Sequence, residues 1–328
     1  MKRGPRLRIR CCPQPEIGDA VIAPFAVVGS TTYPPAMSVY AGSTKAPTPV
    51  EPSIFGHASV DYIDSKSILT PASGFMRRYK YTLNPYGGCG FGCEYCYARF
   101  FAPTAMRREA WGNWVSVKRN GRDLMIRACR SGAVNTGDAI YMSSVTDPYQ
   151  PIEQRLGLTR AILQALLECG VQPRLTIQTR SPMATRDIDL FRQFDKVRVN
   201  FTINADSEEV RLRYEPHSPS IAARLKAAAQ VAAAGVRIGV SISPMLPIRD
   251  IEAFGFRLAS LNADAYSTQY LKSVGSWFAA GSTSETLRKA HEDGWGIGEY
   301  RRACESLARV LGEGCTLFEG ADGYAPVR

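Results

Sequence analysis

The sequence contains neither a long apolar run nor an apolar leader. No stretch of about 18 apolar residues, the minimum for a membrane-spanning helix, occurs in its 328 residues. The basic N-terminus also lacks the apolar core of a signal peptide. Nine cysteines without such a signal indicate a reducing compartment, where thiols bind metals more often than they form disulfides. We therefore expect a cytoplasmic protein with no membrane partner.

Acidic residues are scarce in one segment of the chain. The formal net charge is +10, and residues 76–130 carry 11 Lys and Arg against 3 Asp and Glu, so +8 of the excess lies there. A positive field raises the local concentration of anionic ligands. Two interpretations stay open. The segment either faces an anionic partner, such as a nucleotide, a phosphorylated metabolite or nucleic acid, or it provides ordinary solvated faces of a connecting helix.

Three cysteines lie close together within this segment. Cys89, Cys93 and Cys96 form a C-x3-C-x2-C pattern in the run YTLNPYGGCGFGCEYCYARFF of residues 81–101. No fourth cysteine or histidine follows at short distance. A structural zinc site uses four ligands, whereas three thiolates suit a [4Fe-4S] cluster with one iron left open. A zinc knuckle is the alternative, and the glycines of the run let the backbone wrap closely around either group.

With Tyr95 directly before the third cysteine, this motif resembles that of the radical S-adenosylmethionine (SAM) superfamily. The phrase NPYGGCGFGCEYCYAR is similar to the branch that contains spore photoproduct lyase. The resemblance covers roughly residues 78–270. It implies that SAM binds the open iron of a [4Fe-4S] cluster and that an external electron donor, such as flavodoxin or ferredoxin, reduces the cluster. The resulting 5′-deoxyadenosyl radical then abstracts a hydrogen atom from an organic substrate.

Strands and helices are expected to alternate six times between about residues 79 and 271. The β-rich runs that predict strands are 79–83, 138–144, 174–179, 197–203, 236–243 and 265–271. Helices are expected at 98–106, 123–131, 155–169, 186–194, 221–234 and 251–261. The alternation indicates a parallel sheet with helices outside. The resemblance implies a partial (β/α)6 barrel of TIM type, in which sites lie at the C-terminal ends of the strands.

Composition divides the chain into three expected parts. Residues 1–75 are rich in proline without helical periodicity and predict an irregular extension. Residues 76–272 form the expected barrel, and residues 273–328 a helical C-terminal segment. Within the barrel, Ser218 and Pro219 predict the start of the helix that Gly235 ends.

The resemblance also implies which residues contact SAM. The loop after the second strand matches the place that binds the SAM amino group, which assigns Ser144, Thr146 and Asp147 to the cofactor. An ordinary Asp-Pro turn is the alternative for Asp147. Arg180 matches a lysine thought to reach the SAM carboxylate, and Thr202 matches a serine near the ribose or methionine part.

Three further positions follow from the same comparison. Asn204 is an additional candidate for SAM binding. Tyr95 and Tyr97 flank the last cysteine where relatives use tyrosines in radical relay, and shielding of the cluster is the alternative. Ser143 and Ser144 occupy the region in which the lyase carries a hydrogen-donating cysteine. A serine O–H bond is too strong for that role, so photoproduct repair is not expected.

Three functions remain open from the sequence. The first is a radical SAM enzyme that acts on a nucleotide, nucleoside or nucleic acid. The second is a radical SAM enzyme that makes a small natural product. The third is a non-enzymatic iron–sulfur protein for electron transfer or metal binding.

Overall fold

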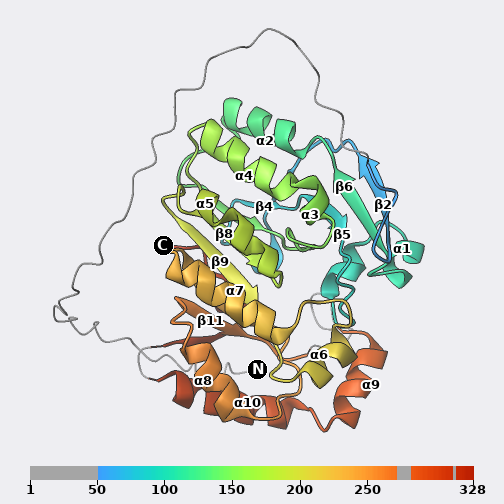
Figure 1. Ribbon diagram of the computed structural model, residues 1–328, viewed down its shortest axis with the longest axis vertical. Helices are drawn as coiled ribbons and strands as arrows, with labels where there is room; N and C mark the ends of the chain where they lie inside the picture. The colour runs from blue at the N-terminus through green and yellow to red at the C-terminus, as the bar shows by residue number, and fades with distance from the viewer. Residues whose placement is uncertain (1–50, 272–281, 313–314) are drawn as a thin grey trace, which may run out of the picture. The chain divides into compact units, whose positions relative to one another are not determined.

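The computed structural model describes residues 51–271, 282–312 and 315–328. Its larger sheet has eight strands in the order β12-β11-β10-β9-β8-β7-β4-β3 (Figure 1). Seven of them run parallel, and only β3 (Leu69–Pro71) is antiparallel to its neighbour. The parallel strands are β4 (Tyr81–Leu83), β7 (Ala139–Met142), β8 (Arg174–Thr179), β9 (Val197–Thr202), β10 (Arg237–Ile242), β11 (Ala265–Thr268) and β12 (Leu317–Glu319). All six predicted strands are confirmed, and β12 and β3 form the two edges of a partial barrel.

Helices cover the outer face of this sheet. Figure 1 shows α4, α7 and α8 in a row along the strands, and α7 contacts both β9 and β10. The helices are α2 (Gly121–Arg130), α3 (Glu153–Leu156), α4 (Leu158–Glu168), α5 (Ile188–Phe191), α6 (Glu208–Tyr214), α7 (Ile221–Ala233), α8 (Ile251–Ala259), α9 (Ser284–Glu292) and α10 (Ile297–Leu311). None of the helices in the described part of the chain has the length and apolarity that a bilayer crossing requires.

Helix α7 buries one stripe of side chains at helical spacing. Ile221, Ala227, Ala228 and Val231 are buried, as the alanine-rich run predicts, but so is Arg224. The predicted start is wrong by two residues, because the hydroxyl of Ser220 rather than Ser218 accepts from the first turn. Ser218 lies instead against Cys93 in the loop of residues 89–96, which we call the cysteine loop.

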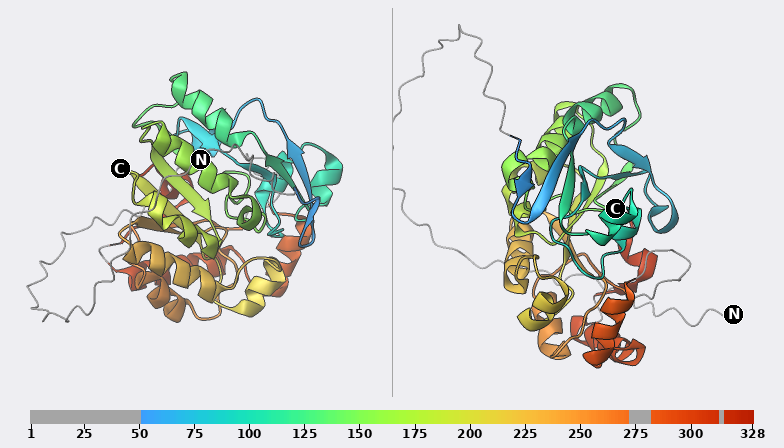
Figure 2. Two further views of the ribbon diagram at one scale, coloured as in Figure 1. Left: turned by 45° about the horizontal axis from the view of Figure 1, so that its top comes forward. Right: turned by 90° about the vertical axis from the view of Figure 1, so that its right-hand side faces the viewer.

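A second, four-stranded sheet contains the flanks of the cysteine loop. Its order is β1-β2-β6-β5, with β1 (Ile54–Phe55), β2 (Ala58–Ile63), β5 (Tyr86–Gly88) and β6 (Trp114–Lys118). Figure 2 shows its blue and teal strands beside the larger sheet. The sequence predicts that the cysteine loop follows the strand at 79–83. The loop instead follows β5, which Asn84 and Pro85 separate from β4.

Residues 54–71 are also more regular than expected. The prediction of an irregular extension is wrong for this stretch, because it forms β1, β2 and β3. Ala58 and Val60 alternate with exposed or half-buried residues and bury their side chains, a pattern of period two that the proline-rich surroundings obscure. Residues 1–50 lie outside the described residues, and the division at 75 and 272 stays a prediction.

The predicted helix at 98–106 is interrupted. The chain forms the short 3₁₀-helix η2 (Tyr97–Phe101) and then α1 (Ala105–Glu109). Ala102 is extended because the residue before a proline, here Pro103, avoids helical angles. Trp114–Lys118 then forms β6, which pairs with β2 and β5.

Candidate functional site

The three cysteines of the motif lie on the wall of one cavity. Cys89 and Cys93 are buried and Cys96 is half-buried, and all three line a cavity of about 650 Å³. Burial raises the pKa of each thiol, to about 11 for Cys96. A bound cation stabilises the thiolate forms, so metal binding here releases protons.

The donor set on this wall consists of three thiols. A structural zinc ion takes four ligands, whereas a [4Fe-4S] cluster with one open iron takes three thiolates. All three thiols line the same cavity, so they can provide the donor set of such a cluster.

Glycines bring the cysteine loop into close contact with β6. Gly88 has φ +69°, and a Cβ there would lie 2.5 Å from the carbonyl oxygen of Trp114. Gly92 has φ +57°, and its Cβ would lie 3.1 Å from Cα of Gly112. Only glycine fits such a close approach in the left-handed region. These two positions shape the backbone on both sides of Cys89.

The loop after β7 holds the cysteine loop through side chains. Thr146 Oγ1 donates to the carbonyl oxygen of Gly88 at 2.6 Å. Gln150 is fully buried, accepts from the N–H of Gly90 at 2.9 Å and donates to Thr146 Oγ1 at 3.2 Å. Sequence reasoning missed Gln150, since no local pattern indicates a partner 60 residues away. Thr146, which is predicted to bind SAM, lines the cavity, but its hydroxyl is hydrogen-bonded to Gly88 and Gln150.

Asp147 joins the loops that follow β7 and β8. Its carboxylate accepts from the N–H of Tyr149 at 2.9 Å, from the hydroxyl of Thr179 at 2.7 Å and from the N–H of Arg180 at 2.9 Å. Burial raises its pKa, and these donors oppose that effect. Asp147 lines the cavity, yet its bonds match the alternative of a structural Asp-Pro turn.

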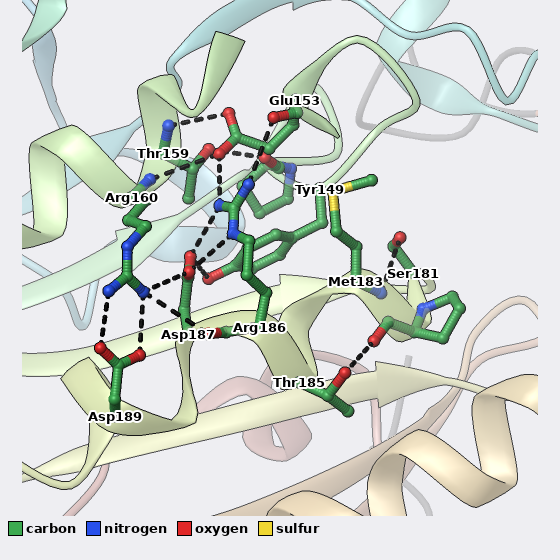
Figure 3. Close-up of polar contacts among 12 residues, drawn as sticks. Tyr149, Glu153, Thr159, Arg160, Ser181, Met183, Thr185, Arg186, Asp187 and Asp189 are labelled. Atoms are coloured by element: carbon green, nitrogen blue, oxygen red, sulfur yellow. Dashed lines mark hydrogen bonds and ion pairs between the residues drawn. The ribbon is translucent and has the colours of Figure 1, made fainter. Parts of the chain in front are cut away.

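A buried ion network anchors the outer end of the same loop. Figure 3 shows the guanidinium of Arg186 between the carboxylates of Glu153 and Asp187, at 2.6 and 2.8 Å. Tyr149 donates to Asp187 at 3.0 Å, and Arg160 contacts Asp187 at 2.9 Å. Glu153 and Asp187 are fully buried, so each needs these partners. The network keeps residues 143–150 in place beneath the cavity.

A second buried network lies behind the cysteine loop. The Tyr95 hydroxyl donates to Glu215 and accepts from Arg180 at 2.8 Å and from the Asn204 amide at 2.7 Å. Burial raises the pKa of Glu215 on its own, but Arg224 and Arg180 outweigh it and lower the pKa to about 2. Tyr95 and Asn204 lie behind the cavity wall, whereas Arg180 reaches it.

Three further predicted site residues, Ser144, Thr202 and Tyr97, line the cavity, and their roles stay predictions. Ser144 Oγ accepts from Asn84 at 3.3 Å, and the Tyr97 hydroxyl donates to the Ser144 carbonyl oxygen. Thr202 Oγ1 accepts from Gln178 at 2.7 Å. Neighbouring strand ends are therefore connected by side-chain hydrogen bonds across the floor of the cavity.

Two polar groups on the cavity wall have no partner among the described residues. These are Ser143 Oγ and the indole nitrogen of Trp111, both buried. Buried polar groups are nearly always hydrogen-bonded, so such groups indicate where a ligand binds. Ser143 also has φ +74°, a conformation that costs a non-glycine residue about 1–2 kcal/mol. The sequence draws attention to Ser143 but contains no sign of Trp111.

The positive segment is partly neutralised by the fold. Five of its eleven basic side chains pair with acids from outside residues 76–130, and its Glu94 pairs with Lys289, so the excess of +8 falls to +4 when these six partners are counted. The pairs are Arg78–Asp322, Lys80–Asp138, Arg107–Asp61, Arg119–Asp64 and Arg122–Glu168. The charge argument for an anionic partner is correspondingly weaker.

Comparisons with known proteins agree with this geometry. Residues 83–255 match the family model of the radical SAM superfamily. An uncharacterized protein of Methanocaldococcus jannaschii is 38% identical over 53% of this chain and 63% of its own length. A radical SAM Nα-GlyT isomerase of Pseudomonas phage M6 is 24% identical over 60% of this chain and 40% of its own. The chain thus spans less than two thirds of these curated relatives.

The fold comparison identifies a similar arrangement of strands and helices. A spore photoproduct lyase with bound SAM and dinucleoside spore photoproduct has a TM-score of 0.55 and 17% identity. The match covers 79% of this chain and 81% of that one. At this identity the likeness concerns the fold, and it includes the partial barrel described above.

Proposed function

The chain belongs to the radical SAM superfamily, and we propose that it abstracts a hydrogen atom from a nucleoside-containing substrate bound in the 650 Å³ cavity. Proteins of this superfamily bind a [4Fe-4S] cluster and SAM. The observation that carries the proposal is the position of Cys89, Cys93 and Cys96 on one cavity wall. When bound, the cluster supplies the electron that cleaves SAM to methionine and a 5′-deoxyadenosyl radical.

The residues of this chain bind, orient and shield the cluster and SAM. The three thiolates hold the cluster and leave one iron open. Arg180 lines the cavity, and besides the Nη1 contact with Glu215 its guanidinium can donate parallel hydrogen bonds to the carboxylate of SAM. Ser144 and Thr202 offer hydroxyls from neighbouring strand ends, and Ser143 offers a hydroxyl without a protein partner.

The other candidate residues act indirectly, by holding the residues that line the cavity. Thr146 and Asp147 hold the loops that carry Ser144 and Arg180, since their own polar atoms are bonded within the protein. Tyr95 accepts from the guanidinium of Arg180, and the Asn204 amide in turn donates to Tyr95. Tyr97 remains the candidate for contact with reacting groups, because it lines the cavity directly. The reducing electron comes from an external donor, for which flavodoxin and ferredoxin are candidates.

The nucleoside class is supported by the ligand of one structural neighbour, a spore photoproduct lyase that contains a dinucleoside photoproduct. A small-molecule biosynthetic enzyme is the second candidate. The pairing of five of the eleven basic residues in 76–130 favours it, because fewer of their charges remain available to neutralise phosphates. A non-enzymatic iron–sulfur protein is the third.

Anaerobic reconstitution with iron and sulfide tests the proposal. The wild type should bind a cluster and form 5′-deoxyadenosine from SAM and a chemical reductant. Cys93→Ala should lose both properties, whereas Cys304→Ala, which changes a half-buried thiol on α10, should keep them. Cluster binding without deoxyadenosine would support an electron-transfer protein. A wild type that takes up no iron would disprove the central claim.

A further inference from the structure

Part of the cavity wall comes from outside the segment that matches the superfamily. The cysteines and the strand ends 143–147, 178–180, 202 and 241–244 lie within residues 83–255. The remaining wall includes Pro71, Phe75, Met76 and Tyr324, which lie before and after that segment. SAM chemistry is common to the superfamily, but substrates differ. The wall outside the common segment is therefore where this chain would distinguish its own substrate.

These outer residues meet where the sheet is open. The 3₁₀-helix η1 (Gly74–Met76) follows the edge strand β3, and η4 (Gly320–Tyr324) follows the opposite edge strand β12. The rings of Phe75 and Tyr324 contact edge to face at 5.3 Å, and Arg78 pairs with Asp322 at 2.6 Å. We call these two turns the η1–η4 seam. It connects the two edges of the partial barrel beside the cavity.

The seam combines aromatic rings with polar groups that are hydrogen-bonded to neighbouring strand ends. One aromatic cluster surrounds the ring of Tyr324. Its centroid lies 5.3 Å from that of Phe75 and 6.4 Å from that of Tyr141. Tyr324 Oη lies 2.9 Å from Ser241 Oγ, and Tyr141 Oη donates to Gln178 at 3.0 Å. Ring faces stack on planar groups, and hydroxyl and amide groups both donate and accept at a ring edge.

We propose that the η1–η4 seam is the specificity-determining wall of the cavity and that it takes a planar nitrogen heterocycle of the nucleobase type. This inference rests on the proposed function and adds the place and the chemistry of substrate recognition. A phosphate suits the seam less well, because the guanidinium of Arg78 is already paired with Asp322. The aromatic rings of Phe75 and Tyr324 on this wall match a planar base better than an aliphatic or highly charged substrate.

Binding of thymidine, deoxyguanosine and free tryptophan to the reconstituted holoprotein with SAM tests the inference. Equilibrium dialysis should detect at least one nucleoside, and Tyr324→Leu should weaken it about tenfold, since base–aromatic stacking contributes substantially. Tyr324→Phe keeps the ring and should lose less. Phe256→Leu changes an exposed ring on α8 and serves as the matched control.

Each contrary result has a definite meaning. Unchanged nucleoside affinity in both Tyr324→Leu and Phe75→Leu, with thermal unfolding as in the wild type, would overturn the inference. Binding of tryptophan alone would overturn the nucleobase class. An equal loss of SAM affinity in Tyr324→Leu would assign the wall to the cofactor instead. If the wild type cleaves SAM but binds no nucleoside, only this inference fails. If it cleaves no SAM, the proposed function fails first.

Discussion

Arg180 and Glu215 form an almost completely buried ion pair, with Nη1 and Oε1 2.6 Å apart and side-chain exposures of 14% and 1%. The second carboxylate oxygen of Glu215 accepts from Arg224, which is fully buried on α7. One carboxylate therefore compensates two guanidinium groups, and Tyr95 connects them to the cysteine loop. This relationship brings together the cysteine loop, the end of β8 and the start of α7.

Glu215→Gln should be strongly destabilising. It leaves two buried arginines without a full counter-charge, and breaking such a pair costs about 3–5 kcal/mol. Urea denaturation of the purified apoprotein measures this change. Glu209→Gln is the matched control, because Glu209 and Arg249 form an exposed pair 3.2 Å apart, which is worth at most about 1 kcal/mol. Equal effects of the two substitutions would contradict the prediction.

The parallel strands could be predicted because each is a short β-rich run between turn residues. RLTIQT at β8 and VRVNFT at β9 show this pattern without reference to the rest of the chain. Strand β5 could not be predicted in this way, because Gly87 and Gly88 carry no side chains that alternate. It forms because β6 pairs with it and Trp114 packs against its glycines.

The candidate site also has a part that could be predicted from the sequence and a part that could not. The cysteines could be identified because the spacing of three ligands is a local property. The roles of Asp147 and Arg180 could not, because their partners Thr179 and Glu215 lie 32 and 35 residues away. A carboxylate at a strand end looks the same in sequence whether it faces a cofactor or joins two loops. Only the distances between strand ends separate these roles.

Gly88→Ala should impair both folding and cluster binding. The residue has φ +69°, and the new Cβ would lie 2.5 Å from the Trp114 carbonyl oxygen. Gly132→Ala is the matched control, because φ is +72° and no atom lies within 4 Å of the new Cβ. The control should cost about 1 kcal/mol through backbone strain alone. Urea denaturation and iron content should therefore show a larger loss for Gly88→Ala, and equal losses would contradict the proposed close approach.

Gln150→Leu should loosen the cysteine loop. The substitution leaves the buried N–H of Gly90 without its acceptor, and an unsatisfied buried donor costs about 1–3 kcal/mol. We expect lower iron retention after dialysis against a chelator and faster exchange of the Gly90 amide. Gln193→Ala, at an exposed side chain bonded to the Asp189 carbonyl oxygen, should retain iron as the wild type does. Unchanged retention in Gln150→Leu would show that the cysteine loop holds its shape without this support.

Ser143→Gly should stabilise the apoprotein and weaken ligand binding. Glycine adopts φ +74° without strain, and the substitution removes a buried hydroxyl that has no partner in the described residues. Because Ser143 lines the cavity, losing its side chain opens no new void in the core. After the entropic cost of glycine, we expect a net gain of about 1 kcal/mol in the free energy of unfolding. Asn262→Gly, at a second non-glycine residue with positive φ, should gain less, since asparagine tolerates this conformation.

If the Ser143 hydroxyl contacts SAM or substrate, holoprotein affinity for SAM or the rate of deoxyadenosine formation should fall in Ser143→Gly and stay unchanged in Asn262→Gly. A loss of stability in Ser143→Gly would instead show that this hydroxyl supports the fold.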